Sequence, residues 1–151
     1  MGIVINRPLD LKLGKVLDDM EIDSGSAPAA IDHIPVLEGG PVQRERGFVI
    51  HEPTGQWEST LRVGDILGVA TSRDILKSIA SGQGPERALI ALGYAGWAAG
   101  QLEREVLDNA WLSGPADSSI IFDVPYEERW ASATRLLGVD PSQLVGDAGH
   151  G

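Results

Sequence analysis

Residues 88–103 read ALIALGYAGWAAGQLE, an apolar run followed by three spaced glycines and a polar ending. The apolar run predicts a buried strand over Arg87–Leu92, because short apolar runs bounded by turn residues are typical of strands inside a sheet. The glycines predict a turn, and the residues after it predict a helix over Trp97–Asn109. Four residues recur at helical spacing and are expected to form the buried stripe of that helix: Ala99, Leu102, Val106 and Ala110.

The rest of the chain alternates between the same two patterns. Further strands are predicted over Gly2–Asn6, Ile34–Glu38, Gly47–His51, Ile66–Thr71 and Ser119–Asp123. Further helices are predicted from Asp10 to Met20, after Ser72, and over Pro125–Leu137, with a short turn at Asp140-Pro141. Because strands and helices interleave, the pattern alone admits both α+β and α/β folds.

Composition narrows the class of protein. A chain of 151 residues suits one domain, at roughly one domain per 100–200 residues. There are no cysteines, which excludes disulfides and thiolate metal sites. The net charge of −10 makes direct DNA binding and binding to an anionic membrane surface unlikely. No apolar run approaches the roughly 18 residues of a membrane span and no signal peptide is recognised, so we expect a cytoplasmic protein.

Two strand-to-helix turns are the best candidates for a ligand site. The first is Thr71-Ser72-Arg73, and the second is Gly93-Tyr94-Ala95-Gly96-Trp97. Free N–H groups at a helix start attract anions, glycine lets a ligand approach the backbone, and Arg73 adds a fixed positive charge. If the two strands are neighbours, both turns open on one edge of the sheet. The alternative is that the glycines serve only close helix-to-sheet packing. The predicted ligand-binding residues are Ser72, Arg73, Gly93, Tyr94, Gly96 and Trp97.

Other reactive residue types have simpler interpretations. Ser72 lacks the flanking glycines of a nucleophile elbow and is interpreted as a helix cap. His51 and Glu52 have no partner at metal-ligand spacing. Glu103 and Glu105 point to different sides of a helix, which argues against an acid–base pair, and Glu105 is expected to be solvated. We therefore predict no catalytic residue, no metal and no cofactor.

Several motifs resemble the YqgE/AlgH family of bacterial proteins, and together they cover nearly the whole chain. They are Gly2-Ile3-Val4-Ile5-Asn6-Arg7-Pro8, Gly39-Gly40-Pro41-Val42, Arg46-Gly47-Phe48-Val49-Ile50-His51, Thr71-Ser72-Arg73-Asp74, Gly93-Tyr94-Ala95-Gly96-Trp97, Gly100-Gln101-Leu102-Glu103, Asn109-Ala110-Trp111-Leu112 and Ala148-Gly149-His150. The resemblance implies a compact α+β domain over residues 1–151, with a mixed, strongly bent sheet and about four helices packed on it. Family members carry some tens of residues upstream, including a hydrophobic strand. That strand is absent here, so Met1 resembles an internal methionine of a longer form.

The resemblance does not supply a reaction, because the family is largely uncharacterised and is called a transcriptional regulator by name only. Since no catalytic motif is found, we expect a non-enzymatic binding or regulatory module with a protein or small-molecule partner. The alternative is a small-molecule or anion-binding protein, or an undiscovered enzyme, that uses the turns at Ser72/Arg73 and Gly93–Trp97.

Overall fold

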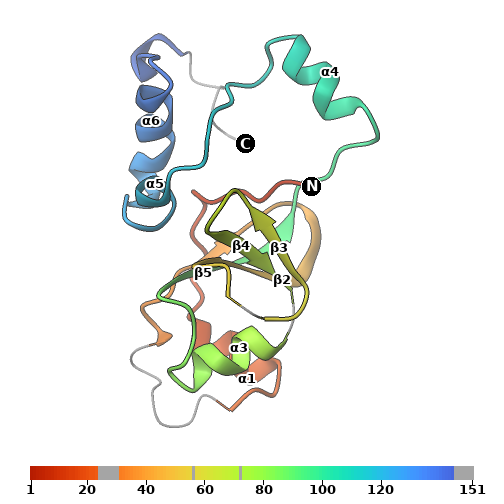
Figure 1. Ribbon diagram of the computed structural model, residues 1–151, viewed down its shortest axis with the longest axis vertical. Coiled ribbons are helices and arrows are strands. Elements are labelled where there is room, and N and C mark those ends of the chain that lie inside the picture. Colours follow the sequence, from red (N-terminus) through yellow and green to blue (C-terminus); the bar gives the residue numbers. More distant parts are fainter. Residues whose placement is uncertain (24–30, 56, 72, 145–151) are drawn as a thin grey trace.

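The computed structural model describes residues 1–23, 31–55, 57–71 and 73–144, and one five-stranded sheet lies at its centre (Figure 1). The strands are β1 (Val36–Glu38), β2 (Val42–Glu52), β3 (Thr60–Val63), β4 (Leu67–Ala70) and β5 (Arg87–Tyr94). Their order across the sheet is β1-β5-β2-β4-β3. β1 and β5 run parallel and the other three pairings are antiparallel, so the sheet is mixed.

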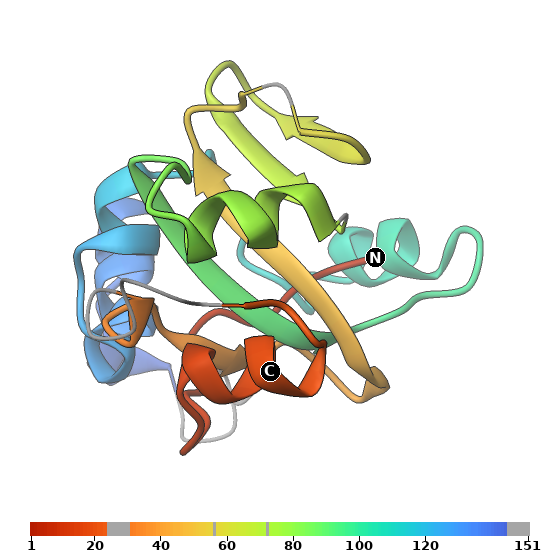
Figure 2. The same ribbon diagram turned by 90° about the horizontal axis from the view of Figure 1, so that it is seen from below.

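Helices cover both faces of the sheet. On one face lie α1 (Leu13–Asp19) and α3 (Arg73–Ala80), and on the other lie α5 (Ser118–Phe122) and α6 (Tyr126–Leu136) (Figures 1 and 2). Successive strand residues serve the two cores in turn: Val49 and Ile90 pack with α1 and α3, whereas Ile50 and Leu89 pack with Ile121 of α5. This alternation follows from the period of two in a strand.

The expected α+β class is confirmed by this arrangement. The helices α1, α3 and α6 and the strands β1, β4 and β5 lie where the sequence pattern predicts them, to within a few residues. Across the described ranges, no helix is both long enough and apolar enough to cross a membrane.

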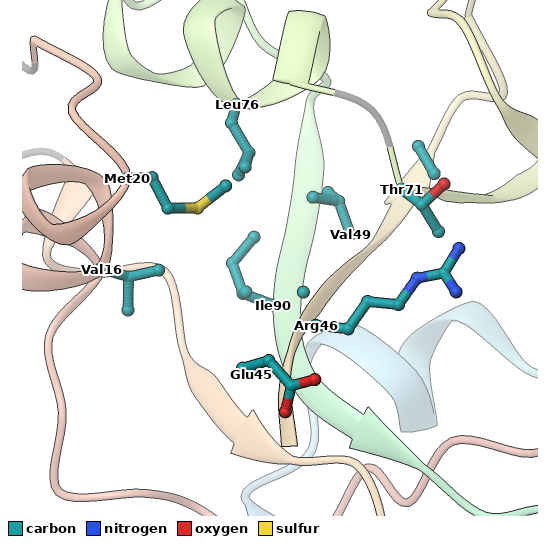
Figure 3. A pocket seen from close by; sticks show the side chains of 10 residues that line it. Val16, Met20, Glu45, Arg46, Val49, Thr71, Leu76 and Ile90 are labelled. Atoms are coloured by element: carbon teal, nitrogen blue, oxygen red, sulfur yellow. The ribbon is translucent and has the colours of Figure 1, made fainter. Parts of the chain in front are cut away.

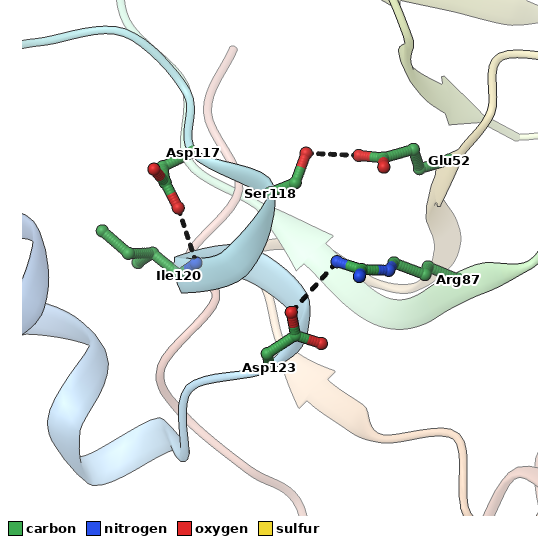
Figure 4. Close-up of polar contacts among 6 residues, drawn as sticks. All are labelled: Glu52, Arg87, Asp117, Ser118, Ile120 and Asp123. Carbon is green, nitrogen blue, oxygen red and sulfur yellow. Dashed lines mark hydrogen bonds and ion pairs between the residues drawn. The ribbon is translucent and has the colours of Figure 1, made fainter.

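The predicted strand over residues 119–123 is wrong, because these residues form helix α5. The Asp117 side chain accepts a hydrogen bond from the backbone N–H of Ile120 at 3.0 Å, which is a helix N-cap. The Ser118 hydroxyl donates to the Glu52 carboxylate, and Arg87 pairs with Asp123 at 3.1 Å (Figure 4). The cap and these two contacts with the ends of β2 and β5 outweigh the β-branched character of the segment.

The N-terminal segment and the central hairpins also differ from expectation. Residues 2–6 form no strand: Gly2 makes a single bridge to Ala95, and the Val4 N–H donates to Gly39. β2 begins at Val42 instead of residue 47, and β3 is a strand that no prediction covers. Residues 43–46 are all polar or charged, which hid the strand character of the start of β2.

Helix α4 (Gln101–Leu107) begins four residues later than predicted and has no buried residue. Gly100 precedes it with φ of 77°, a left-handed conformation that glycine adopts without strain. The predicted buried stripe is therefore wrong: Ala99, Val106 and Ala110 are exposed and Leu102 is half-buried. Figures 1 and 2 show α4 standing away from the sheet.

Candidate functional site

A cavity of about 200 Å³ lies between α1, α3 and the sheet face that they cover (Figure 3). Most of its wall is apolar and comes from three elements of the sheet and both helices: Val16, Met20, Val49, Ala70, Leu76 and Ile90. Three polar side chains complete it: Glu45, Arg46 and Thr71. The cavity is therefore an apolar hollow with a charged margin.

A break in the β-ladder creates that charged margin. β2 pairs with β5 from Gly47 to Glu52, then shifts register, and pairs again only at Val42 with Tyr94. Residues 43–46 thus have no partner in the ladder, and Gln43 has φ of 48°. Bulges of this kind redirect side chains, and here the bulge presents Glu45 and Arg46 to the cavity.

Gly93 permits the bulge from the opposite strand. Its φ is 79°, and a Cβ atom there would lie 2.4 Å from the Gly40 carbonyl oxygen. Any side chain at this position would force the β1–β2 connection away from β5. Gly93 therefore helps to shape the cavity margin although it does not line the cavity.

Arg73 fixes the far wall of the cavity. Its guanidinium donates a hydrogen bond of 2.8 Å to the Met20 carbonyl oxygen, at the end of α1. This contact joins the start of α3 to the end of α1, and Met20 lines the cavity between them. Ser72, predicted beside it, lies outside the described residues.

The two predicted turns do not form one shared opening. β2 lies between β4 and β5, so the strands that lead into the turns are not neighbours. Tyr94 packs edge-on against Phe48 with ring centroids 5.8 Å apart, Gly96 is exposed, and Trp97 lies on Gly2. A direct role of Arg73, Gly93, Tyr94, Gly96 or Trp97 in ligand binding stays a prediction.

The second candidate binding feature is the segment of residues 96–116, which is called the arm below. None of these residues is buried, although the segment carries two tryptophans and a helix. Glycines anchor its two ends: Trp97 packs on Gly2, and Gly114 packs on Leu137, the residue after α6, where a Cβ atom would approach to 2.2 Å. The arm is therefore attached at both ends and exposed between them.

Glu105 holds the arm together from inside. Its carboxylate accepts hydrogen bonds from the Trp111 indole at 2.8 Å, the Gln101 amide at 3.0 Å and the Trp97 indole at 3.1 Å. The two indoles meet edge to face with centroids 5.8 Å apart. These hydrogen bonds, that from Trp111 first, lower the pKa of Glu105. The sequence did not predict this role, because the spacing of a glutamate on an exposed helix does not show which indole N–H groups will donate to it.

The arm exposes four large apolar side chains. Leu107 is 81% exposed, and three further large apolar side chains beside it are also exposed: Val106, Trp111 and Leu112. These four residues are called the arm face. Exposed apolar patches mark interaction surfaces in soluble proteins, which makes the arm face a candidate for one.

The remaining candidates have structural roles in the described residues. His51 is buried in the sheet, and no group of three or more potential metal ligands is found in the described ranges. The Trp57 indole donates to the Ser78 hydroxyl at 3.2 Å and packs against the α1–α3 core. Glu103 is exposed on α4.

Comparison with known proteins places the chain in a family. The family model described as AlgH-like matches residues 1–142. A UPF0301 protein of Nitrosococcus oceani is 55% identical over 99% of this chain and 79% of its own length, and one of Methylococcus capsulatus is 52% identical over 100% and 79%. The solution structure of AlgH from Pseudomonas aeruginosa is 51% identical, with a TM-score of 0.76 over 100% of this chain and 79% of that one. Protein DIP2367 from Corynebacterium diphtheriae shares the fold at 16% identity, with a TM-score of 0.65 over 89% of this chain and 69% of that one. The motifs, the family model and these relatives agree: the chain belongs to the AlgH-like family.

Proposed function

We propose that the protein is a cytoplasmic, non-enzymatic binding module that recognises a partner protein through the arm face. The observation that carries this proposal is the exposure of Val106, Leu107, Trp111 and Leu112 on an arm whose interior is braced. An arm that existed only to connect β5 with α5 would not need two tryptophans that donate to one carboxylate. Aromatic anchors with neighbouring aliphatic side chains are the usual centre of a protein interface.

Rigidity supports the same role. The Glu105 carboxylate accepts a hydrogen bond from each indole N–H. The Gln101 amide oxygen accepts from the Ala98 N–H at 3.0 Å, which ties the backbone before α4 to its first residue. A surface that is ordered before binding loses less conformational entropy when the partner arrives.

Charge defines the partner. The whole chain carries −10, and the arm itself carries Glu103, Glu105 and Asp108 against the single cation Arg104. A second copy would bring the same negative charge to the interface, whereas a cationic partner is attracted over long range. The partner that fits is a basic amphipathic helix or segment, with apolar residues for the arm face and Lys or Arg around them. A regulatory role would then operate through this protein contact.

The test uses a synthetic amphipathic peptide of leucine and lysine, about 18 residues long, with a charge-reversed peptide of leucine and glutamate as control. Binding is measured by fluorescence anisotropy at physiological salt. We expect the basic peptide to bind and Leu107→Ser to weaken it about tenfold, since Leu107 is the most exposed part of the face. Leu61→Ser, which alters a leucine of β3 that is 61% exposed and lies off the arm, is the matched control and should change nothing.

Three outcomes would overturn the proposal. Equal loss of peptide binding in Leu107→Ser and Leu61→Ser would show that the peptide adsorbs to the protein surface without preference for the arm face. Equal binding of both peptides would remove the charge argument. Concentration-dependent dimerisation that Leu107→Ser abolishes would make a second copy the occupant of the arm face.

A further inference from the structure

The cavity between α1, α3 and the sheet points to a separate ligand, which does not depend on the arm. Its volume of about 200 Å³ lies below the roughly 300–1,000 Å³ of sites for drug-sized molecules, so only a small molecule fits. Six of its lining residues are apolar, which favours a short aliphatic group in the interior. The floor is set by Ala70, Val49 and Ile90, which lie side by side on β4, β2 and β5.

The margin carries one charge of each sign. Glu45 and Arg46 are consecutive residues of the bulge, and both line the cavity (Figure 3). Among the described residues, no ion pair uses either side chain. Arg46 donates one hydrogen bond, to the Gln43 amide oxygen at 3.3 Å, and a guanidinium has five N–H donors. The Arg46 guanidinium also lies over the Phe48 ring, 5.5 Å from its centroid, a contact that does not use its N–H donors, so both charges can still meet a ligand.

An anion alone would be repelled by Glu45, and a cation alone would be repelled by Arg46. A molecule that carries a carboxylate and an ammonium group on adjacent atoms satisfies both. We infer that the cavity binds a small aliphatic α-amino acid, with its carboxylate on Arg46, its ammonium group on Glu45 and its side chain between Met20, Leu76 and Val16.

The polar and apolar parts of the cavity are placed for this orientation. Figure 3 shows Val16, Met20 and Leu76 together on one side and Glu45, Arg46 and Thr71 along the other. The Thr71 hydroxyl offers a further donor or acceptor for the head group. Arg73 holds the Met20 carbonyl, so the apolar wall is fixed before a ligand enters.

The experiment is an NMR titration of the protein labelled with ¹⁵N, using L-leucine as the probe up to about 20 mM. Three matched probes each remove one feature: 4-methylpentanoate lacks the ammonium group, 3-methylbutylamine lacks the carboxylate, and glycine lacks the side chain. We expect saturable shifts around the cavity with L-leucine and at least tenfold weaker binding of each control probe.

Substitutions that remove one charge each test whether Glu45 and Arg46 bind the ligand. Glu45→Gln and Arg46→Gln should each weaken L-leucine binding about tenfold, and both alter exposed side chains. Arg44→Gln is the control, because Arg44 lies in the same bulge but does not line the cavity. Absence of saturable shifts, equal binding of 4-methylpentanoate, or equal effects of Arg44→Gln and Arg46→Gln would overturn the inference. Shifts confined to residues 96–116 would also overturn it, while leaving the proposed role of the arm face to its own test.

Discussion

At the scale of single residues, His51 is a buried imidazole whose protonation opposes folding. It is 0% exposed, and because a carbonyl only accepts, Nδ1 donates to the Pro53 oxygen at 2.9 Å. Within the described structure its Nε2 is buried without a hydrogen-bond partner, and the ring packs edge-on against Trp57. Burial lowers the pKa of His51, although the hydrogen bond to Pro53 works in the opposite direction.

The unfolded chain therefore takes up the His51 proton more readily than the folded protein. The free energy of unfolding should fall as the pH drops below about 6.5, by up to about 1.4 kcal/mol per pH unit, until the lower pKa of the folded state is passed. Urea denaturation at pH 7.5 and 5.5 measures this loss. His51→Asn keeps a donor for Pro53 but does not titrate, so its loss should be smaller than that of the wild type. His33→Gln, at an exposed position, is the control and should follow the wild type; a His51→Asn profile identical to the wild type would contradict the assignment.

At the scale of elements, the arm depends on one carboxylate. Glu105→Gln replaces an acceptor of three hydrogen bonds with an amide whose NH₂ cannot accept from an indole. We expect the Trp97 and Trp111 indole N–H signals to shift and the amides of α4 to exchange faster, while the main unfolding transition moves little, since no residue of α4 is buried.

The lowered pKa of Glu105 also fixes how the order of the arm should depend on pH. Because the pKa of Glu105 is lowered, the order of the arm is complete above the unfolded value near 4.3 and is lost as the pH falls through the folded value. Glu103→Gln is the control, on the same helix with an exposed side chain. Unchanged indole signals in Glu105→Gln would show that the carboxylate does not brace the arm.

Elements also show what the sequence could and could not predict. β4 and β5 were predictable because each is a short apolar run, and α3 and α6 because their apolar residues recur at helical spacing. Residues 119–123 were predicted as a strand by propensity, whereas the cap from Asp117 and the contacts of Ser118 and Asp123 favour helix α5. The cavity margin was not predictable, because Glu45 and Arg46 reach it through a register shift that no local pattern encodes. Gly93 was selected as a ligand-binding residue, and its observed contacts show how it makes that shift possible.

At the scale of the whole molecule, Arg129 joins the two ends of the described chain. This residue of α6 is 4% exposed, and its guanidinium donates to the carbonyl oxygens of Val124, at 2.9 Å, and of Ile5. It also lies over the Tyr126 ring, 5.0 Å from the centroid. Burial lowers the pKa of Arg129, yet a guanidinium stays charged at neutral pH, so both hydrogen bonds are charge-assisted.

Arg129→Met should therefore destabilise the protein by more than the loss of one packing contact would. The methionine fills similar space but leaves two half-buried carbonyl groups without their donor, which should lower the free energy of unfolding by about 2–4 kcal/mol. It should also release the N-terminal segment, seen as faster exchange of the Val4 amide, which donates to Gly39. Arg135→Met, at an exposed position of the same helix, is the control and should change stability by less than about 0.5 kcal/mol. If both variants denature at the same urea concentration, the N-terminal segment is held by its other contacts, and the link from α6 to Ile5 contributes nothing.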